Sequence, residues 1–344
     1  MPATLHLDAG KPEDISQAAG LLRSGGTVAF ATETVYGLGA NALSEAAVAK
    51  IFDAKQRPSW DPLIVHLASP AEIGSITSVE GELKSRVDLL AASFWPGPLT
   101  LLLPRNAAVP DAVTAGRHLV GVRVPSHPAA LALLKAVALP IAAPSANTFG
   151  HTSPTTAAHV LADLAGRIDA VLDAGPTTVG LESTVLDPSQ TPMVLYRPGA
   201  VTAEQISAVT GVPVDVFRPA EASATLPQES LPSPGVGIRH YAPRARLVLV
   251  EGSEPALNRS LHGVLAGKAE RIGVLLPKDW HLDEVALIEP WAAWNDQAAL
   301  AATLFAGLRA LDDRDVTIIL CPVPPSGGLN DAIRDRLEKA ARQS

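Results

Sequence analysis

Basic side chains near the ends of apolar segments are the first candidates for chemistry in this sequence. Arg123 lies within the apolar run "VGVRVP", where a guanidinium group must contact an anion or several acceptors to offset its desolvation. A structural ion pair and a bound carboxylate or phosphate explain this position equally well. Lys55 and Arg57, in "KQRPSWDP", stand where a helix gives way to Pro58, and the helix dipole alone accounts for cations there. The basic residues therefore indicate a site only in combination with other features.

Hydroxyl and amide side chains occupy similar positions. The loop "PSANTFGHTSPT", residues 144–155, carries them at Ser145, Asn147, Thr148, Thr152 and Ser153. Such a loop can direct hydroxyl and N–H groups at phosphate oxygens, although it is also typical of an ordinary turn and lacks the Gly-Lys-Ser/Thr of a Walker loop. Ser183 in "GLESTVLD" begins a strand, and Arg197 in "LYRPGA" lies near the end of the next. Because polar groups recur at strand ends, where a sheet presents side chains to a ligand, we predict one shared site.

The sequence lacks the usual hydrolytic and metal-binding motifs. It contains no G-x-S-x-G and no H-E-x-x-H segment, and its nine histidines do not have ligand spacing. His66, in "LIVHL", is by itself more typical of a hydrogen-bonded core residue than of a functional group. The cations, hydroxyls and one or two imidazoles suit a polyanion and a small zwitterion, with catalysis by positioning and charge stabilisation.

The elements that must position these groups follow one another irregularly over residues 1–211. Helical patterns cover 12–26, 44–57, 81–95, 155–167 and 202–211, and strand patterns cover 27–32, 63–67, 99–104, 120–125, 140–147, 170–175, 183–187 and 193–199. Several strands follow one another without an intervening helix, so we predict an α/β domain with a twisted mixed sheet. The last helix begins with a Thr202/Gln205 capping box and closes this unit.

A second α/β unit is predicted after a linker. Residues 212–244 lack periodicity and are rich in Pro, Ser and Glu, which is typical of an extended linker. Residues 245–344 alternate strands and helices and predict a smaller, Rossmann-like doubly wound domain with a parallel sheet. No G-x-G-x-x-G follows its first strand, so no dinucleotide site is predicted.

Composition sets the broad class. With 344 residues, 47% hydrophobic and 18% charged, the chain is long enough for two packed domains. The formal charge of −8 does not favour nucleic-acid binding through bulk phosphate attraction. A single cysteine, Cys321, excludes an internal disulfide and a cysteine-rich metal site. The N-terminal segment lacks the apolar core of a signal peptide and no apolar run has membrane-spanning length, so we expect a cytoplasmic protein with no membrane partner.

The motifs of the first unit resemble, in the same order, those of threonylcarbamoyl-AMP synthases, whose catalytic unit is the YrdC domain. They are "TETVYGLG", the K-x-R of "KQRPSWDPLIVH", "FWPGPLTLLL", "GVRVP", "PSAN", "STVLD" and "RPGA". With the linker motif "SPGVGIRHYAP" and a second α/β domain, the chain is similar to the long, two-domain form of that family over nearly its whole length.

The resemblance implies a nucleotidyltransferase that converts ATP, L-threonine and bicarbonate into threonylcarbamoyl-AMP and pyrophosphate. Another protein, a threonylcarbamoyl transferase, then modifies an adenosine beside the anticodon of certain tRNAs, so tRNA is only an indirect partner. The transition-state charge on the phosphates needs cations, which would be Mg²⁺ bound with ATP together with Lys55 and Arg57. The resemblance implies no fixed protein metal site and no tightly bound organic cofactor. The sequence does not reveal which residue, if any, acts as a base, and our hypothesis is that positioned, desolvated substrates suffice without one.

The resemblance also assigns binding residues. The threonine pocket would comprise Thr34, His66, Arg123, Ala143 and Ser183, and ATP would be bound by Arg57, Asp61, Ser145, Asn147, Ser153, Arg197 and Tyr241. Arg123 would pair with the threonine carboxylate in a bidentate manner that lysine cannot reproduce. Asp61 departs from the family pattern, since relatives often carry Asn or His there. Tyr241 would reach the nucleotide from the linker, which would then cover the site as a lid.

The hydroxyl-rich segment "ATETVYGLGA", residues 31–40, gains an explanation from the resemblance. We expect the strand to end here as one wall of a polar pocket, with Thr34 contacting threonine and with Gly37 and Gly39 allowing a tight turn. Without the other motifs, an ordinary strand-to-loop turn would explain the segment as well.

Two other functions are compatible with a YrdC domain. The first is carbamoyl adenylation within a hydrogenase-maturing carbamoyltransferase, but the chain lacks the zinc-finger cysteines and acylphosphatase segment of those proteins. The second is an RNA-binding module without turnover, which the acidic total charge disfavours.

Overall fold

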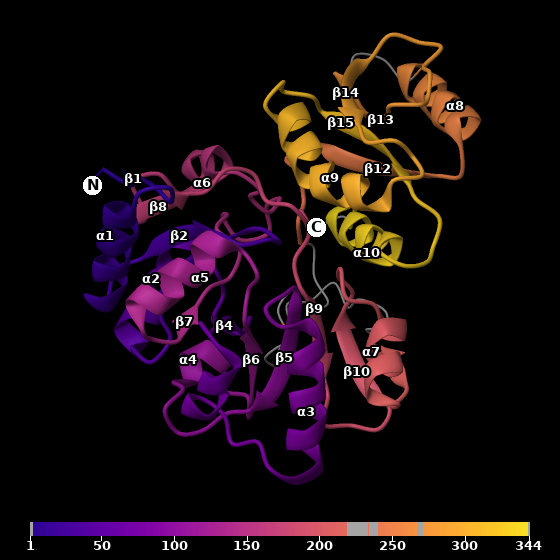
Figure 1. The fold of residues 1–344 in the computed structure, drawn as a ribbon. Coiled ribbons are helices and arrows are strands. Elements are labelled where there is room, and N and C mark those ends of the chain that lie inside the picture. The colour runs from indigo at the N-terminus through magenta and orange to yellow at the C-terminus, as the bar shows by residue number, and fades with distance from the viewer. Residues whose placement is uncertain (1–2, 219–232, 234–239, 267–270, 343–344) are drawn as a thin grey trace. The chain divides into compact units, whose positions relative to one another are not determined.

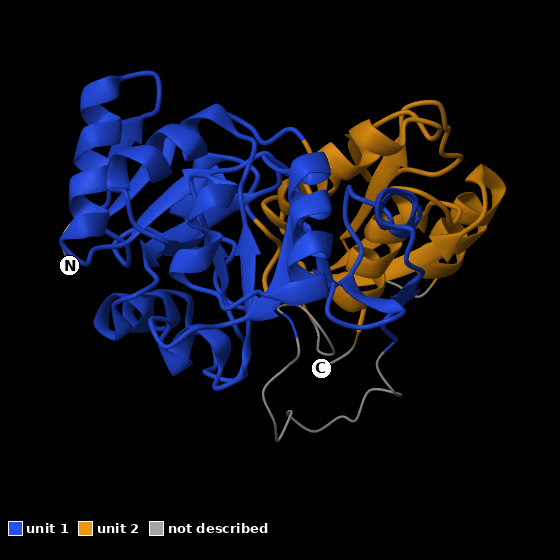
Figure 2. Cartoon of the chain, turned by 60° about the horizontal axis from the view of Figure 1, so that its bottom comes forward, with its two compact units in different colours: residues 1–149, 154–178, 182–237 blue, residues 150–153, 179–181, 238–344 orange. Residues whose placement is uncertain are grey.

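The computed structural model describes residues 3–218, 233, 240–266 and 271–342 (Figure 1). The chain divides into two compact units (Figure 2). The first contains residues 1–149, 154–178 and 182–237, and the second contains residues 150–153, 179–181 and 238–344. Each unit is described by itself below.

An eleven-stranded sheet forms the centre of the first unit. In spatial order its strands are β1 (Leu5–Asp8), β8 (Ala170–Asp173), β2 (Val28–Ala31), β3 (Tyr36–Asn41), β7 (Ile141–Ala142), β4 (Ile64–His66), β6 (Leu119–Arg123), β5 (Leu99–Pro104), β9 (Thr184–Asp187), β10 (Met193–Arg197) and β11 (Val214–Val216). The pairs β1/β8, β2/β8 and β4/β6 are parallel, whereas β2/β3 and β5/β6 are antiparallel. The predicted mixed sheet is confirmed.

Helices pack on both faces of this sheet. They are α1 (Pro12–Arg23), α2 (Glu45–Lys55), α3 (Gly81–Phe94), α4 (Asp111–Thr114), α5 (Pro128–Val137), α6 (Ala157–Leu164) and α7 (Ala203–Thr210), with a 3₁₀ turn η1 (Pro70–Ser75). Strand β2 shows why two layers form: Val28 and Phe30 join a core with α1 and α5, whereas Ala29 and Ala31 join a core with α2, α3 and α6. Alternate residues of a strand face opposite sides of a sheet, so an entirely apolar strand requires cover on both faces.

Gly37 and Gly39 do not form the predicted turn, which is a correction. Both lie within strand β3, and neither has a positive φ. A Cβ at Gly39 would lie 2.8 Å from Phe30 Cε1 and 2.9 Å from Ile141 Cγ2. Gly37 forms an isolated β-bridge with Ser145. Glycine is needed here for close approach of neighbouring chains and not for a left-handed turn.

The second unit contains a four-stranded sheet in the order β12-β15-β13-β14, and all of its strand pairs are parallel. Its strands are β12 (Arg246–Glu251), β13 (Ile272–Pro277), β14 (Leu287–Trp291) and β15 (Ile318–Val323), and its helices are α8 (Glu254–Leu265), α9 (Gln297–Asp312) and α10 (Asn330–Ala340). The predicted parallel sheet is confirmed, and β14 is an additional edge strand.

The predicted linker, residues 212–244, falls largely outside the described residues. Val214–Val216 form strand β11, which pairs in parallel with β10. Residues 219–232 and 234–239 are not described. Among the described helices, none combines the length and apolarity needed to cross a membrane.

Candidate active site

Arg123, the last residue of β6, directs its guanidinium group toward the segment between β2 and β3. Its Nε donates to the Gly97 carbonyl oxygen at 3.2 Å, and Nη1 donates to Thr34 Oγ1 at 2.9 Å. Nη2 lies 2.6 Å from Glu33 Oε1, and Arg123 and Glu33 are only 3% and 5% exposed. Thr34 Oγ1 in turn lies 2.8 Å from Thr32 Oγ1. Two residues of the predicted threonine pocket, Thr34 and Arg123, are therefore in direct contact.

His66 lies beside Arg123. The two residues are register partners in the parallel strands β4 and β6. Burial lowers the pKa of His66 to about 3, and the positive Arg123 outweighs the opposing effect of Glu33. His66 Nδ1 makes no hydrogen bond of acceptable geometry within the described part of the chain. The imidazole is therefore neutral near pH 7 and has a ring nitrogen available to a ligand hydroxyl.

Lys55 connects the K-x-R segment to the serine and asparagine loop. It ends α2, is 1% exposed, and donates from Nζ to the carbonyl oxygens of Ser145 and Asn147, each at 2.5 Å. Burial lowers the pKa of Lys55 well below its usual value, and the neighbouring Arg57 lowers it further. A bound phosphate would stabilise the charged ammonium at this position.

Arg57 forms a buried ion pair with Asp61. Arg57 Nη2 lies 3.0 Å from Asp61 Oδ2 and donates to the Pro62 carbonyl oxygen at 2.7 Å. The guanidinium carbon lies 5.8 Å from the centroid of the Phe149 ring. Burial raises the pKa of Asp61, although Arg57 and other cations oppose this effect. Asp61 thus holds Arg57, while its predicted contact with ATP stays a prediction.

Ser183 and Arg197 form another contact in the first unit. Arg197 donates from Nη2 to Ser183 Oγ at 3.2 Å and from Nε to the Ser183 carbonyl oxygen at 3.0 Å. Ser183 Oγ also lies 2.8 Å from Thr100 Oγ1. The serine predicted to bind threonine and the arginine predicted to bind ATP are therefore neighbours.

The cations gather around one carboxylate. Lys55, Arg57 and Arg197 all act electrostatically on Asp61. Asp163 raises the pKa of Lys55, whereas Arg167 lowers it. Lys55, Arg57 and Arg197 are buried, and together with Arg167 they outnumber the carboxylates Asp61 and Asp163, so a bound anion would stabilise this group. This cluster is suited to the phosphates of a nucleotide.

Ala143 contributes its backbone. Its N–H donates to the Ile64 carbonyl oxygen at 2.9 Å, beside the short strand β7. A Cβ on Gly37 would lie 3.3 Å from Ala143 Cβ, so β3 approaches this segment closely. The predicted role of Ala143 in threonine binding stays a prediction.

Ser153 and Tyr241 belong to the second unit. The Tyr241 ring stacks on Phe305 with centroids 5.8 Å apart, and the guanidinium carbon of Arg336 lies 5.1 Å from its centroid. Thr152 Oγ1 donates to the Tyr241 carbonyl oxygen at 3.4 Å. Tyr241 has a φ of 64°, a conformation that is strained for a bulky residue. The predicted contacts of Ser153 and Tyr241 with ATP are not tested by these observations.

Sequence reasoning missed Glu33 and Thr100. Thr100 lies inside the apolar strand β5, where a lone hydroxyl gives little signal. Glu33 is the acidic residue of the motif "TETVYGLG", but the motif does not reveal its ion-pair partner, because Arg123 is distant in the sequence. A buried arginine predicted from "VGVRVP" could have prompted a search for a matching carboxylate.

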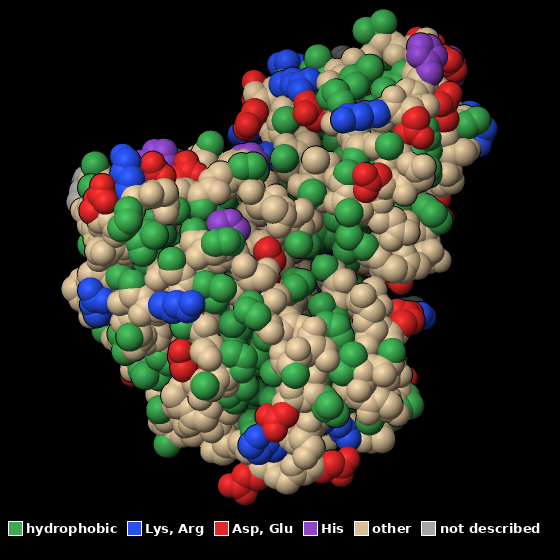
Figure 3. Space-filling model, in the orientation of Figure 1, with side chains coloured by type: hydrophobic (Ala, Val, Ile, Leu, Met, Phe, Trp, Pro, Cys, Tyr) green, Lys and Arg blue, Asp and Glu red, His purple; other side chains and the backbone are tan. Residues whose placement is uncertain are grey.

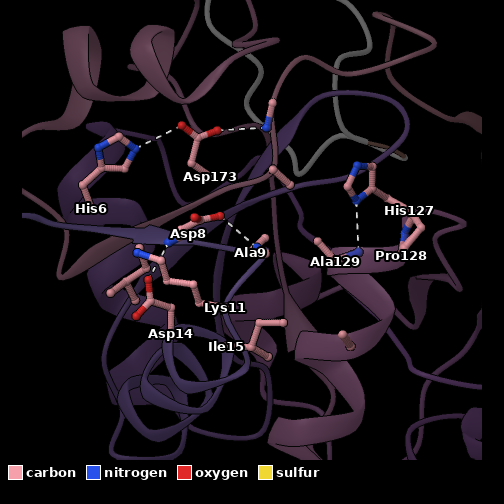
Figure 4. Close-up of a pocket in the computed structure, with 15 residues that line it drawn as sticks. His6, Asp8, Ala9, Lys11, Asp14, Ile15, His127, Pro128, Ala129 and Asp173 are labelled. Atoms are coloured by element: carbon pink, nitrogen blue, oxygen red, sulfur yellow. Dashed lines mark hydrogen bonds and ion pairs between the residues drawn. The ribbon is translucent and has the colours of Figure 1, made fainter.

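A further concavity of about 890 Å³ lies elsewhere in the first unit, between the ends of β1 and β8 and the starts of α1 and α5 (Figure 4). In it, His6 Nε2 lies 3.0 Å from Asp173 Oδ2, and Asp8 accepts a hydrogen bond from Gly10 N–H at 2.8 Å. None of the predicted site residues lines this concavity.

Comparisons with known proteins show the family to which the chain belongs. Residues 20–199 match the Sua5–YciO–YrdC family model (telomere recombination), and residues 201–342 match the model for the threonylcarbamoyl-AMP synthase C-terminal domain. The chain is 43% identical over 340 residues to the threonylcarbamoyl-AMP synthase of Bacillus subtilis, covering 98% of this chain and 95% of the relative. It is 41% identical over 328 residues to that of Pyrococcus abyssi, covering 94% and 93%.

A solved structure is also similar along the whole chain. The crystal structure of P. abyssi Sua5 complexed with L-threonine superimposes with a TM-score of 0.88 at 38% identity, covering 98% of this chain and 97% of that one. The P. abyssi protein is therefore similar to this chain in both sequence and fold.

Proposed function

The chain belongs to the threonylcarbamoyl-AMP synthase family, and we propose that it makes threonylcarbamoyl-AMP and pyrophosphate from ATP, L-threonine and bicarbonate. The observation that carries this proposal is the presence of two regions of different charge in the first unit. One contains Arg123, Thr34 and neutral His66, and the other contains the cations around Asp61. The first suits an amino acid and the second suits a triphosphate.

The chemistry proceeds in two balanced steps. The threonine ammonium group loses a proton to solvent, and the resulting amine and bicarbonate form a carbamate and release water. A carbamate oxygen then attacks the α-phosphorus of ATP, and pyrophosphate leaves with the electrons of the broken P–O bond. Lys55 and Arg57 would stabilise the charge that develops on the phosphate oxygens.

Arg123 would hold the carboxylate of threonine, and His66 Nδ1 would contact its hydroxyl group. Arg123 is already fixed by Gly97 and Thr34, so it is positioned before threonine binds. No side chain is assigned as a general base, and positioned reactants would supply the rate enhancement.

We propose that Mg²⁺ enters with the ATP phosphates. Within the described ranges, no three His, Cys, Asp or Glu side chains group as metal ligands, and Asp61 is engaged by Arg57. The ion would neutralise phosphate charge beside Lys55 and Arg57.

The product is a reactive mixed anhydride, so a transferase must consume it. We propose that this second protein contacts tRNA and that the present chain does so only indirectly, in the cytoplasm where tRNA and ATP are present. On the face shown in Figure 3, Lys and Arg side chains are scattered and do not form one continuous basic patch. That face gives no support to an RNA-binding module.

Pyrophosphate release by the purified protein tests the proposal. Release should require both L-threonine and bicarbonate, and it should fall when L-threonine is replaced by L-serine or L-allothreonine. Release that does not depend on threonine would contradict the proposed acceptor.

A further inference from the structure

We propose that the carboxylate of Glu33 binds the ammonium group of threonine, so that Glu33 and Arg123 together recognise the amino acid as a zwitterion. This inference rests on the proposed function and identifies a further specificity-determining residue in the same site.

Glu33 is a buried carboxylate with unused acceptor capacity. Its Oε1 lies 2.6 Å from Arg123 Nη2, and the residue is 5% exposed. Neither carboxylate oxygen makes a hydrogen bond of acceptable geometry within the described residues, although the N–H groups of Ser126 and of Glu33 itself are close enough to lower the pKa of Glu33. An ionised carboxylate offers about four acceptor positions, and buried polar atoms are nearly always satisfied. The vacant positions therefore suit a donor from a ligand.

Arg123 likewise has N–H donors that its protein contacts do not use. A guanidinium group carries about five N–H donors, and the contacts to Gly97, Thr34 and Glu33 use one each. The remaining donors suit a carboxylate. Arg123 and Glu33 thus present a positive and a negative group side by side, each incompletely coordinated.

Charge balance favours a zwitterion over a simple carboxylic acid. Glu33 and Arg123 are together neutral, so a ligand carboxylate alone would add an uncompensated negative charge beside Glu33. An ammonium group on the adjacent carbon cancels that charge. Burial would raise the pKa of Glu33, but Arg123 and the nearby backbone N–H groups of Glu33 and Ser126 together lower it, so the carboxylate is ionised near pH 7.

Among the described residues, Arg123 is the cation that acts on the pKa of Glu33. Arg123 acts electrostatically on Glu33, and Glu33 acts on His66 and His127. Burial lowers the pKa of His66 to about 3 and also lowers that of His127, so both imidazoles are mainly neutral near pH 7. Neither imidazole therefore adds a positive charge beside an ammonium group bound to Glu33.

The alternative is that Glu33 only positions Arg123. The two roles, binding the ammonium group and positioning Arg123, can be distinguished by measuring the affinities of two ligands by calorimetry in the absence of turnover. The first is L-threonine, and the second is the 2,3-dihydroxybutanoate of matching configuration, in which a hydroxyl replaces the ammonium. The wild-type protein should bind threonine more tightly. In Glu33→Gln, threonine binding should weaken by about 10- to 100-fold while analogue binding stays within about threefold or tightens.

Further variants control for folding and charge. Glu33→Asp keeps the charge and should keep a preference for threonine over the analogue. Glu82→Gln breaks another Glu–Arg pair, in which Arg86 Nη2 lies 3.0 Å from Glu82 Oε1 on helix α3, and should change neither ligand's affinity. If Glu33→Gln and Glu33→Asp weaken both ligands by the same factor, Glu33 is a positioning residue and the inference is overturned.

The binding measurements also distinguish failure of the proposed function from failure of this inference. If the wild-type protein does not bind threonine, the proposed substrate is wrong and the inference falls with it. If the wild type binds threonine and Glu33→Gln keeps its full preference over the analogue, the inference alone is wrong.

Discussion

His66 and Arg123 are register partners at the last residues of the neighbouring parallel strands β4 and β6. Register partners of adjacent strands point to the same face of a sheet, so the imidazole lies beside a permanent positive charge. Burial and that charge both disfavour protonation of His66. The candidate threonine pocket therefore combines a charged guanidinium group with a neutral imidazole.

The neutrality of His66 predicts that stability falls at acidic pH. The pKa of His66 is about 3 in the folded protein and about 6.5 in an unfolded chain, so the unfolded state binds more protons between these values. As the pH falls below 6.5, the free energy of unfolding should decrease by up to about 1.4 kcal/mol per pH unit from this residue. Urea unfolding of the wild type and of His66→Gln between pH 6.5 and pH 5 measures the difference. Equal slopes in the two proteins would contradict the pKa assigned to His66, and His262→Gln, at an exposed position, is the control.

Replacing Arg123 by lysine should raise the threonine KM by about 10- to 100-fold. Lysine keeps the positive charge but cannot contact Gly97, Thr34, Glu33 and a carboxylate simultaneously. The ATP KM should change by less than about threefold, since Arg123 lies outside the cation cluster. Pyrophosphate release at varied threonine measures both constants, with Arg23→Lys on α1 as control. An unchanged threonine KM would remove Arg123 from the pocket.

Lys55 should make ATP binding depend on pH. Burial and Arg57 lower the pKa of Lys55, and only the protonated ammonium attracts phosphate. ATP affinity should therefore fall as pH rises through that pKa, and ATP binding should raise the pKa in return. Calorimetric titration of ATP at several pH values measures the fall. Lys55→Arg stays charged throughout this range and should bind ATP with a smaller pH dependence. The same dependence in both proteins would assign the titration to another group.

Tyr241 is predicted to affect ATP binding more than threonine binding. Because its ring stacks on Phe305 and lies against Arg336, Tyr241→Ala would also destabilise the second unit, by about 3 kcal/mol or more. Tyr241→Phe keeps the ring and isolates the hydroxyl group. We expect Tyr241→Phe to raise the ATP KM and to leave the threonine KM nearly unchanged. Equal effects on both constants would count against the predicted lid.

The sequence predicted most strands because most of them are apolar runs bounded by turn residues. Helix α5 was not assigned, although Pro128 begins it and Ala130, Leu133, Leu134 and Val137 form its buried face. Strand β3 was mistaken for a turn because Gly37 and Gly39 suggested one. Their close packing against Phe30 and Ala143 depends on strands that are distant in the sequence.

The site was predictable only where a residue type is unusual for its surroundings. An arginine in an apolar strand made Arg123 a candidate, and the family motifs added Thr34, Lys55 and Ser183 as candidates. Glu33 could not be paired with Arg123 from sequence, since the contact depends on how the segment after β2 folds against β6. The charge balance around Asp61 likewise emerges only when α2, β10 and the following loops are brought together.

The most direct test is the mass of the product formed from ATP, L-threonine and ¹³C-labelled bicarbonate. The proposed reaction predicts threonylcarbamoyl-AMP with one ¹³C per molecule and an equal amount of pyrophosphate. Unlabelled threonyl-AMP would mean that the threonine carboxylate attacks ATP directly. That result, or pyrophosphate without any labelled adduct, would contradict the proposed synthesis.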